Sequence, residues 1–140
     1  MKRGLQTILG ALITCTAIST QCEINFNDHG LYFGRLNHLQ SEAAFYQAQK
    51  NGQHVVFKFS ANWCGPCQQL TTTLQKLAAE FENVLFIEIE ISRFNTLKSK
   101  FNIRRIPTVI FFKDGAQVHR STGAQTKTYW TDVIRDSFGL

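Results

Sequence analysis

Two cysteines, Cys64 and Cys67, have the spacing of a pair that can open and close a disulfide. Side chains three residues apart on a helix are neighbours, with Cβ atoms about 5–6 Å apart. A small adjustment brings such a pair to the geometry of a disulfide. A helix starting here would also point its unpaired N–H groups and positive dipole end at Cys64, which would stabilise a thiolate. The pattern predicts thiol–disulfide chemistry.

Other uses of a C-x-x-C pair have less support in this chain. Half a zinc site would need two further ligands, and the sequence has no second pair at metal-ligand spacing. A purely structural disulfide closing so short a loop would remove little entropy from the unfolded chain. We therefore expect no metal and no cofactor, and we interpret the four histidines as surface residues: His29, His38, His54 and His119.

The sequence around the pair, W-C-G-P-C at residues 63–67, resembles the active site of the thioredoxin family. Residues 106–108, Ile-Pro-Thr, resemble the cis-proline loop of that family, and residues 112–115 resemble its hairpin turn. Gly123 stands where the family has a glycine before its last helix. The resemblance covers roughly residues 40–138 and implies the thioredoxin fold, an α/β architecture with a central mixed β-sheet flanked by helices.

The resemblance also assigns roles at the site. The thiolate of Cys64 would attack a substrate sulfur, and Cys67 would resolve the mixed disulfide. Pro107 would be cis and pack against the disulfide, leaving the backbone of Ile106 to pair with an extended substrate strand. Gly123 would be a third substrate-binding position.

Three residues support the cysteines. Gly65 keeps the approach to the sulfurs uncrowded, and Pro66 is tolerated in a first helical turn because its missing N–H has no partner there to lose. Trp63 either shields the site or fills the core.

One pair of residues departs from the family pattern. Thioredoxins usually carry a buried acid six residues before the first cysteine and a lysine on the next strand, whereas this chain has Lys58 and Glu88. In family register the two would face each other beneath the sulfurs, so the buried charge would stay paired. Three roles remain open: a structural ion pair, a proton relay to Cys67 by a lysine of lowered pKa, and stabilisation of a Cys67 thiolate.

Periodicity predicts the remaining elements. Apolar residues at helical spacing indicate helices near 40–50, 65–81, 94–101 and 130–138, with Ser41 and Gly52 bounding the first. β-branched and aromatic runs indicate strands over 55–61, 84–91 and 108–112, the last continuing through a hairpin turn to about residue 121. Residues 20–38 read as an irregular lead-in or a short edge strand, and 39–140 as the thioredoxin domain.

The first 19 residues have the features of a signal peptide. Lys2 and Arg3 precede an apolar run, residues 5–18, which is followed by small residues suited to cleavage. We expect an exported protein, periplasmic or secreted. The alternatives are an uncleaved membrane anchor and a lipid at Cys15. Cys22 would survive cleavage as an odd thiol, either idle or pairing with another chain.

Charge and cysteine content restrict the partners. Removal of Lys2 and Arg3 leaves 13 basic and 10 acidic residues, or +3, without the basic and aromatic run of a nucleic-acid face.

We expect a monomeric thiol–disulfide oxidoreductase that acts on protein substrates with disulfides or thiols. In an oxidising compartment a reducing member would need a membrane electron donor. The direction of electron flow stays open, and the alternative function is a binding or assembly module without redox turnover.

Overall fold

The computed structural model describes residues 30–140 of the chain, which contain five strands and four helices. The predicted signal peptide at 1–19, Cys15 and Cys22 lie outside this part. The elements are β1 Leu36–His38, α1 Glu42–Asn51, β2 His54–Ser60, α2 Gly65–Glu80, β3 Leu85–Glu90, α3 Asn95–Lys100, β4 Thr108–Lys113, β5 Ala116–Thr122 and α4 Lys127–Phe138.

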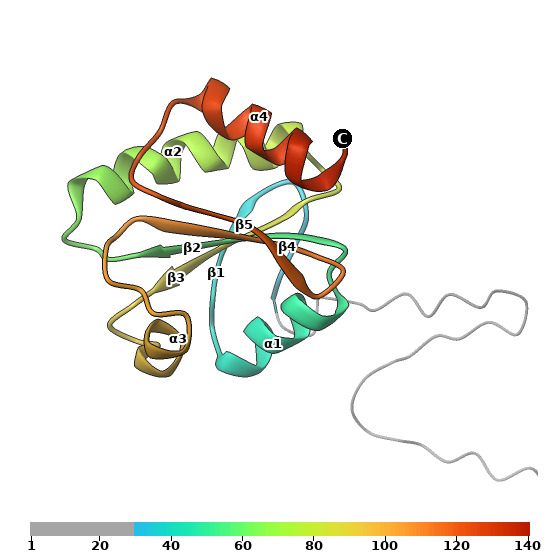
Figure 1. The fold of residues 1–140 in the computed structure, drawn as a ribbon. Coiled ribbons are helices and arrows are strands. Elements are labelled where there is room, and N and C mark those ends of the chain that lie inside the picture. Colours follow the sequence, from blue (N-terminus) through green and yellow to red (C-terminus); the bar gives the residue numbers. More distant parts are fainter. Residues whose placement is uncertain (1–29) are drawn as a thin grey trace, which may run out of the picture.

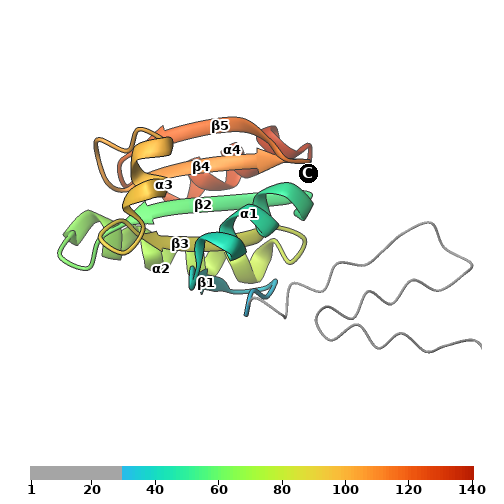
Figure 2. The ribbon, with the colours of Figure 1, turned by 90° about the horizontal axis from the view of Figure 1, so that it is seen from below.

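The five strands form one mixed sheet in the order β1-β3-β2-β4-β5 (Figure 2). β1, β3 and β2 are parallel, whereas β4 is antiparallel to β2 and β5 is antiparallel to β4. Helices α2 and α4 cover one face of the sheet and α1 and α3 cover the other (Figure 1). The predicted α/β fold is confirmed.

Alternation along the central strands produces two apolar cores, because successive side chains point to opposite faces. The core under α1 and α3 contains Phe57, Ile87 and Ile110, one from each of three neighbouring strands. The core under α2 and α4 contains Phe86 and Phe111 with Trp130 of α4. Both faces of β2 are therefore buried, as its β-branched and aromatic run predicts.

Local signals place the ends of α1 and the hairpin. The Ser41 hydroxyl accepts a hydrogen bond from the Ala44 N–H at 3.1 Å, which confirms the predicted N-cap. Gly52 ends the helix for a packing reason, since a Cβ there would lie 2.5 Å from the Ala48 carbonyl oxygen. Asp114 and Gly115 join β4 to β5 with φ of 50° and 85°, the positive values that a tight hairpin turn requires.

The segment before α1 contributes to the fold. Of the two alternatives for its end, the structure has the short edge strand: β1 pairs in parallel with β3. Leu31 and Leu39, on either side of β1, are buried in the core under α1. Within residues 30–140, no helix combines the length and apolar character needed to cross a membrane.

Candidate active site

Cys64 and Cys67 form a disulfide at the N-terminus of α2, with their Cα atoms 5.2 Å apart. Cys64 is the N-cap residue, and its sulfur accepts a hydrogen bond from the Cys67 N–H at 3.3 Å. Cys64 is 7 % exposed and Cys67 is 1 % exposed. Cys64 is therefore the more exposed of the two cysteines, and its sulfur lies against a helical N–H, an arrangement that favours a thiolate in the reduced protein.

The α2 helix holds this pair against the sheet. Its apolar face, repeating at i, i+4, i+7 and i+8, is buried in the core shared with α4: Leu70, Leu74, Leu77 and Ala78. β2 ends at Ser60, so only four residues separate the central strand from the helix. The cysteines are thus fixed at the carboxyl ends of the parallel strands, the edge where α/β sheets usually carry their sites.

The predicted proline loop lies next to the disulfide. The Ile106–Pro107 peptide bond is cis, as the resemblance implies. Ile106 packs against the small cluster formed by Ala61 and the two cysteines. The Pro107 carbonyl accepts a hydrogen bond from the Gly123 N–H at 2.8 Å, and Gly123 has φ of 98°, which favours glycine. Of the three predicted substrate-binding positions, Ile106 therefore lies against the sulfurs, Pro107 follows it in the chain, and Gly123 is bonded to the same loop.

The residues flanking the cysteines are open to solvent. Trp63 is 77 % exposed, so the alternative that it fills the core is wrong. Gly65 and Pro66 are exposed as well, and a Cβ added at Gly65 would meet no atom within 4 Å. The space in front of the disulfide is therefore free for a partner chain.

The swapped charges meet beneath the first turn of α2. The register of β2 and β3 places Lys58 directly opposite Glu88, and the Lys58 ammonium donates to Glu88 Oε1. Lys58 is fully buried. It also donates to the Thr71 hydroxyl and, at 2.8 Å, to the Cys67 carbonyl oxygen. All three ammonium donors are satisfied, which is what burial of a charged lysine requires. The predicted ion pair is confirmed.

Opposing effects set the ionisation of this pair. Burial lowers the pKa of Lys58, while the hydrogen bond to Glu88 and the charge of that carboxylate raise it part of the way back. Burial by itself would raise the pKa of Glu88, but the hydrogen bond and charge of Lys58 lower it below its usual value, helped by hydrogen bonds from Ser60 and Thr71. Glu88 is accordingly ionised at neutral pH.

Two neighbours of the pair were missed by sequence reasoning. The Thr71 hydroxyl lies 3.0 Å from both the Cys67 carbonyl oxygen and Glu88 Oε1, so it links α2 to β3. Its position four residues after Cys67, on the same helix face, was an available signal. His38 is 67 % exposed, as expected of a surface residue, but its Nδ1 atom also lies 3.6 Å from Glu88 Oε2. Only the pairing of β1 with β3 reveals that contact.

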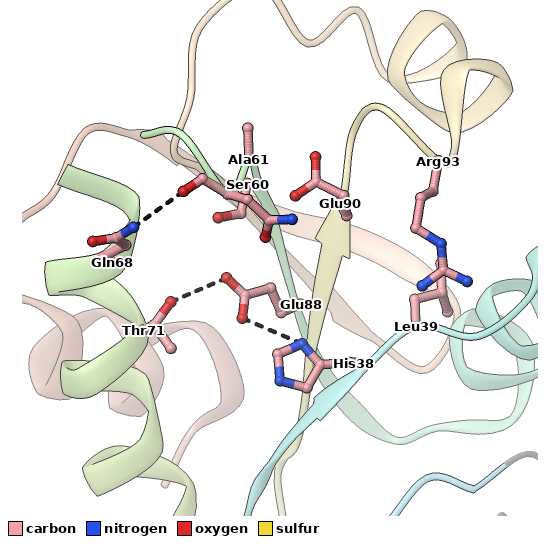
Figure 3. A pocket seen from close by; sticks show the side chains of 10 residues that line it. His38, Leu39, Ser60, Ala61, Gln68, Thr71, Glu88, Glu90 and Arg93 are labelled. Carbon is pink, nitrogen blue, oxygen red and sulfur yellow. Dashed lines mark hydrogen bonds and ion pairs between the residues drawn. The ribbon is translucent and has the colours of Figure 1, made fainter. Parts of the chain in front are cut away.

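A cavity of about 350 Å³ opens beside the pair (Figure 3). Its lining combines the ends of β1, β2 and β3 with the first turns of α2. The lining residues are His38, Leu39, Ser60, Ala61, Asn62, Gln68, Thr71, Glu88, Glu90 and Arg93. Figure 3 shows the Glu88 carboxylate between Thr71 and His38, so the buried pair reaches solvent through Glu88.

The sheet order, the disulfide at a helix N-terminus and the adjacent cis-proline define a thioredoxin-fold protein with a redox-capable cysteine pair. Comparison with known proteins agrees, since residues 37–136 match the model of the thioredoxin family. The chain belongs to the thioredoxin family. Family membership together with the cysteine pair supports a thiol–disulfide oxidoreductase.

Individual relatives cover most of this domain. Thioredoxin of Mycoplasmoides gallisepticum is 31 % identical over 100 residues, which are 71 % of this chain and all of that protein. Thioredoxin of Chlamydia trachomatis is 41 % identical over 73 residues, 52 % of this chain and 72 % of that protein. Among solved structures, the N21Q mutant thioredoxin of Halobacterium salinarum superposes with a TM-score of 0.72 at 27 % identity, covering 78 % of this chain and 96 % of that one.

Proposed function

We propose that the protein is an exported thiol–disulfide oxidoreductase that exchanges disulfides with protein substrates through Cys64 and Cys67. The observation that carries the proposal is the disulfide itself, placed at the start of α2 with its outer sulfur hydrogen-bonded to a helical N–H. In the reduced protein the Cys64 thiolate attacks a substrate disulfide and one substrate thiol leaves. Cys67 then attacks Cys64, which releases the second substrate thiol and closes the observed disulfide.

The substrate is proposed to be an extended protein segment. Ile106 packs against the cluster of Ala61 and the two cysteines, and the Gly123 N–H is hydrogen-bonded to the carbonyl of the neighbouring Pro107. Strand-like pairing with exposed backbone gives affinity with little dependence on sequence. Trp63 adds a large apolar surface at the rim, as an exposed tryptophan commonly does at binding sites.

Export is proposed from the first residues of the chain. Lys2 and Arg3 before the apolar run at 5–18 are typical of a signal peptide, which would place the domain in the periplasm or outside the cell. There a reducing activity needs electrons from a membrane donor, because the compartment is oxidising. We propose that the domain works as a monomer.

Insulin reduction with dithiothreitol tests the enzymatic function. The wild type is expected to accelerate precipitation of the reduced insulin chains, and a Cys64→Ser, Cys67→Ser variant to leave the uncatalysed rate unchanged. Equal rates for the two proteins would reject the oxidoreductase and favour the binding module. Fractionation of an exporting host, followed by determination of the N-terminus of the recovered protein, tests export and cleavage near residue 19.

Two further experiments test the assigned roles of the cysteines. Iodoacetamide at neutral pH is expected to label Cys64 first in the reduced protein, since the alkylating agent reacts with an accessible thiolate. Faster labelling of Cys67 would reverse the roles. The Cys67→Ser variant is expected to retain mixed disulfides with client proteins, because attack survives and resolution is lost, whereas Cys64→Ser should retain none.

A further inference from the structure

Three adjacent strands carry one row of ionisable side chains beneath the resolving cysteine. His38 of β1 lies opposite Glu88 of β3, and Glu88 lies opposite Lys58 of β2. The carboxylate contacts both neighbours, Lys58 through Oε1 and the His38 Nδ1 atom through Oε2 at 3.6 Å. Lys58 in turn donates to the Cys67 carbonyl. A continuous polar connection therefore runs from the surface to Cys67.

The position of His38 in this row is firmly set by its neighbours. The buried Asn37 side chain donates to the Phe86 carbonyl at 2.9 Å and also bonds the backbone of Tyr32. On the other side, the Leu39 N–H donates to the Glu88 carbonyl at 2.9 Å. These bonds fix both residues that flank His38 onto β3. The imidazole is held over Glu88 while remaining 67 % exposed to solvent.

We propose that His38 is a positioning residue for the resolution step, acting through Glu88 and Lys58 on Cys67. This inference rests on the proposed function, in which Cys67 resolves the mixed disulfide. When His38 carries a proton it shares the Glu88 carboxylate with Lys58, so the row bears a net positive charge instead of none. That charge favours the thiolate of Cys67 over its thiol. Acidic conditions reduce the fraction of Cys67 that is a thiolate. Protonation of the His38 imidazole opposes that reduction.

The other charged groups near His38 and Glu88 do not cancel the effect of His38 protonation on Cys67. Among the residues lining the cavity, Glu90 and Arg93 carry opposite charges, and α2 contributes only the uncharged Gln68 and Thr71. Glu90 is already engaged by the Ser92 hydroxyl at 2.9 Å. Histidine is the residue type that ordinarily changes charge between pH 5 and 8, and His38 is the one histidine among the residues lining the cavity.

The chemical step itself is unchanged by His38. In resolution the Cys67 thiol loses its proton to water, a bond forms between the two enzyme sulfurs, and the bond from Cys64 to the substrate sulfur breaks. The substrate leaves as a thiolate and takes a proton from water. Over the full cycle two electrons pass from the dithiol to the substrate disulfide. His38 alters only the thiolate fraction of Cys67, and it is not consumed.

Stopped-flow measurement of thiol release from a chromogenic disulfide tests the inference, since attack releases the first thiol and resolution the second. His38→Gln should slow resolution relative to the wild type by about threefold more at pH 5.5 than at pH 8, a modest factor because the imidazole is largely exposed. The rate of attack by Cys64 should be equal in the two proteins. His54→Gln is the matched control, because His54 begins β2 at the opposite end from the site and stacks on Phe138.

A constant ratio of resolution rates from pH 5.5 to pH 8 would overturn the inference, as would an equal slowing of attack. The route through Glu88 has its own test. In a Lys58→Met, Glu88→Leu background, His38→Gln should leave the pH profile of resolution unaltered, and a persisting difference would show that His38 acts otherwise. Failure of the proposed function looks different, because the wild type would then release no substrate thiol at all.

Discussion

The two faces of the sheet bury different kinds of side chain. Under α1 and α3 the described residues bury no charged side chain, and Phe45 packs against Phe57 with a ring-centroid distance of 4.3 Å. Under α2 and α4 the core is apolar only at one end, around Phe111 and Trp130. At the other end, below the disulfide, the same strands bury Lys58 and its charged partner.

This difference shows where the fold accepts an energetic cost. A buried ion pair contributes less to stability than well-packed apolar residues of the same volume. Yet Lys58 binds the carbonyl of Cys67 and, with Thr71, ties the first turn of α2 to the sheet. The face under α1 and α3 therefore serves stability, and the charged end of the opposite face serves the position and electrostatics of the sulfurs. The following predictions test that division.

The largest loss of stability is expected on the apolar face. Phe57→Ala should reduce the free energy of unfolding by about 3–5 kcal/mol, since the ring is fully buried and its removal leaves a cavity among aromatic neighbours. The oxidised protein can be unfolded in guanidinium chloride to measure this. Insulin reduction at a temperature where the variant is folded should stay near the wild-type rate. A strong loss of turnover in the folded variant would contradict the assignment of this face to stability alone.

Breaking the ion pair should cost somewhat less. Glu88→Gln is expected to destabilise by about 2–4 kcal/mol, because it leaves the fully buried Lys58 ammonium without its counter-charge. Lys58→Met should cost less than Glu88→Gln, since Glu88 is 12 % exposed and the cavity admits water to it. Equilibrium unfolding of both single variants and of Lys58→Met, Glu88→Leu completes a double-mutant cycle. The double variant is expected near the wild type, and a double loss equal to the sum of the single losses would mean that the two charges are uncoupled.

The pH dependence of the free energy of unfolding should reflect the ionisation of Lys58 and Glu88. The pKa of Glu88 is lowered from 4.5 in the folded state, so its contribution is complete above that value and is lost as pH falls through the lowered pKa. The pKa of Lys58 is lowered from 10.5, so the unfolded chain binds more protons below 10.5 and stability rises with pH there. The stability of the wild type relative to the double variant should therefore rise with pH in both the acid and the alkaline window. If the free energy of unfolding of the two proteins had the same pH dependence, this prediction would be wrong.

The smallest change in stability is expected at the rim. Trp63→Ala should alter the free energy of unfolding by no more than about 0.5 kcal/mol, because the side chain is mostly exposed. Its effect should appear in the KM for a protein substrate, which loses the apolar contact, while reaction with a small disulfide stays the same. A matched substitution at the exposed Val118 of β5, Val118→Ala, should leave both measurements unchanged.

The sequence determined much of this protein through local rules. The C-x-x-C pair, the β-branched run of β2 and the helical spacing of Leu70 and Leu74 each follow from short-range geometry, so the fold class and the two cysteines could be predicted. The facing of Lys58 and Glu88 was also predictable, given the family register. The helix of α4 was foreseen from Trp130 onward, and it begins three residues earlier at Lys127, behind the Thr126 N-cap.

Only the tertiary structure determined which residues lie next to Lys58, Glu88 and the cysteines. β1 has only three residues, too few for periodicity to reveal, and its pairing with β3 depends on bonds such as that from Asn37 to the Phe86 carbonyl. That pairing brings His38 to Glu88 across 50 residues of sequence. Trp63 shows the same limit, because a tryptophan suits a core and a binding rim equally well by composition, and only the folded loop exposes it. Local spacing encodes the elements and the sulfurs, whereas the surroundings of the sulfurs are set by contacts between segments distant in the chain.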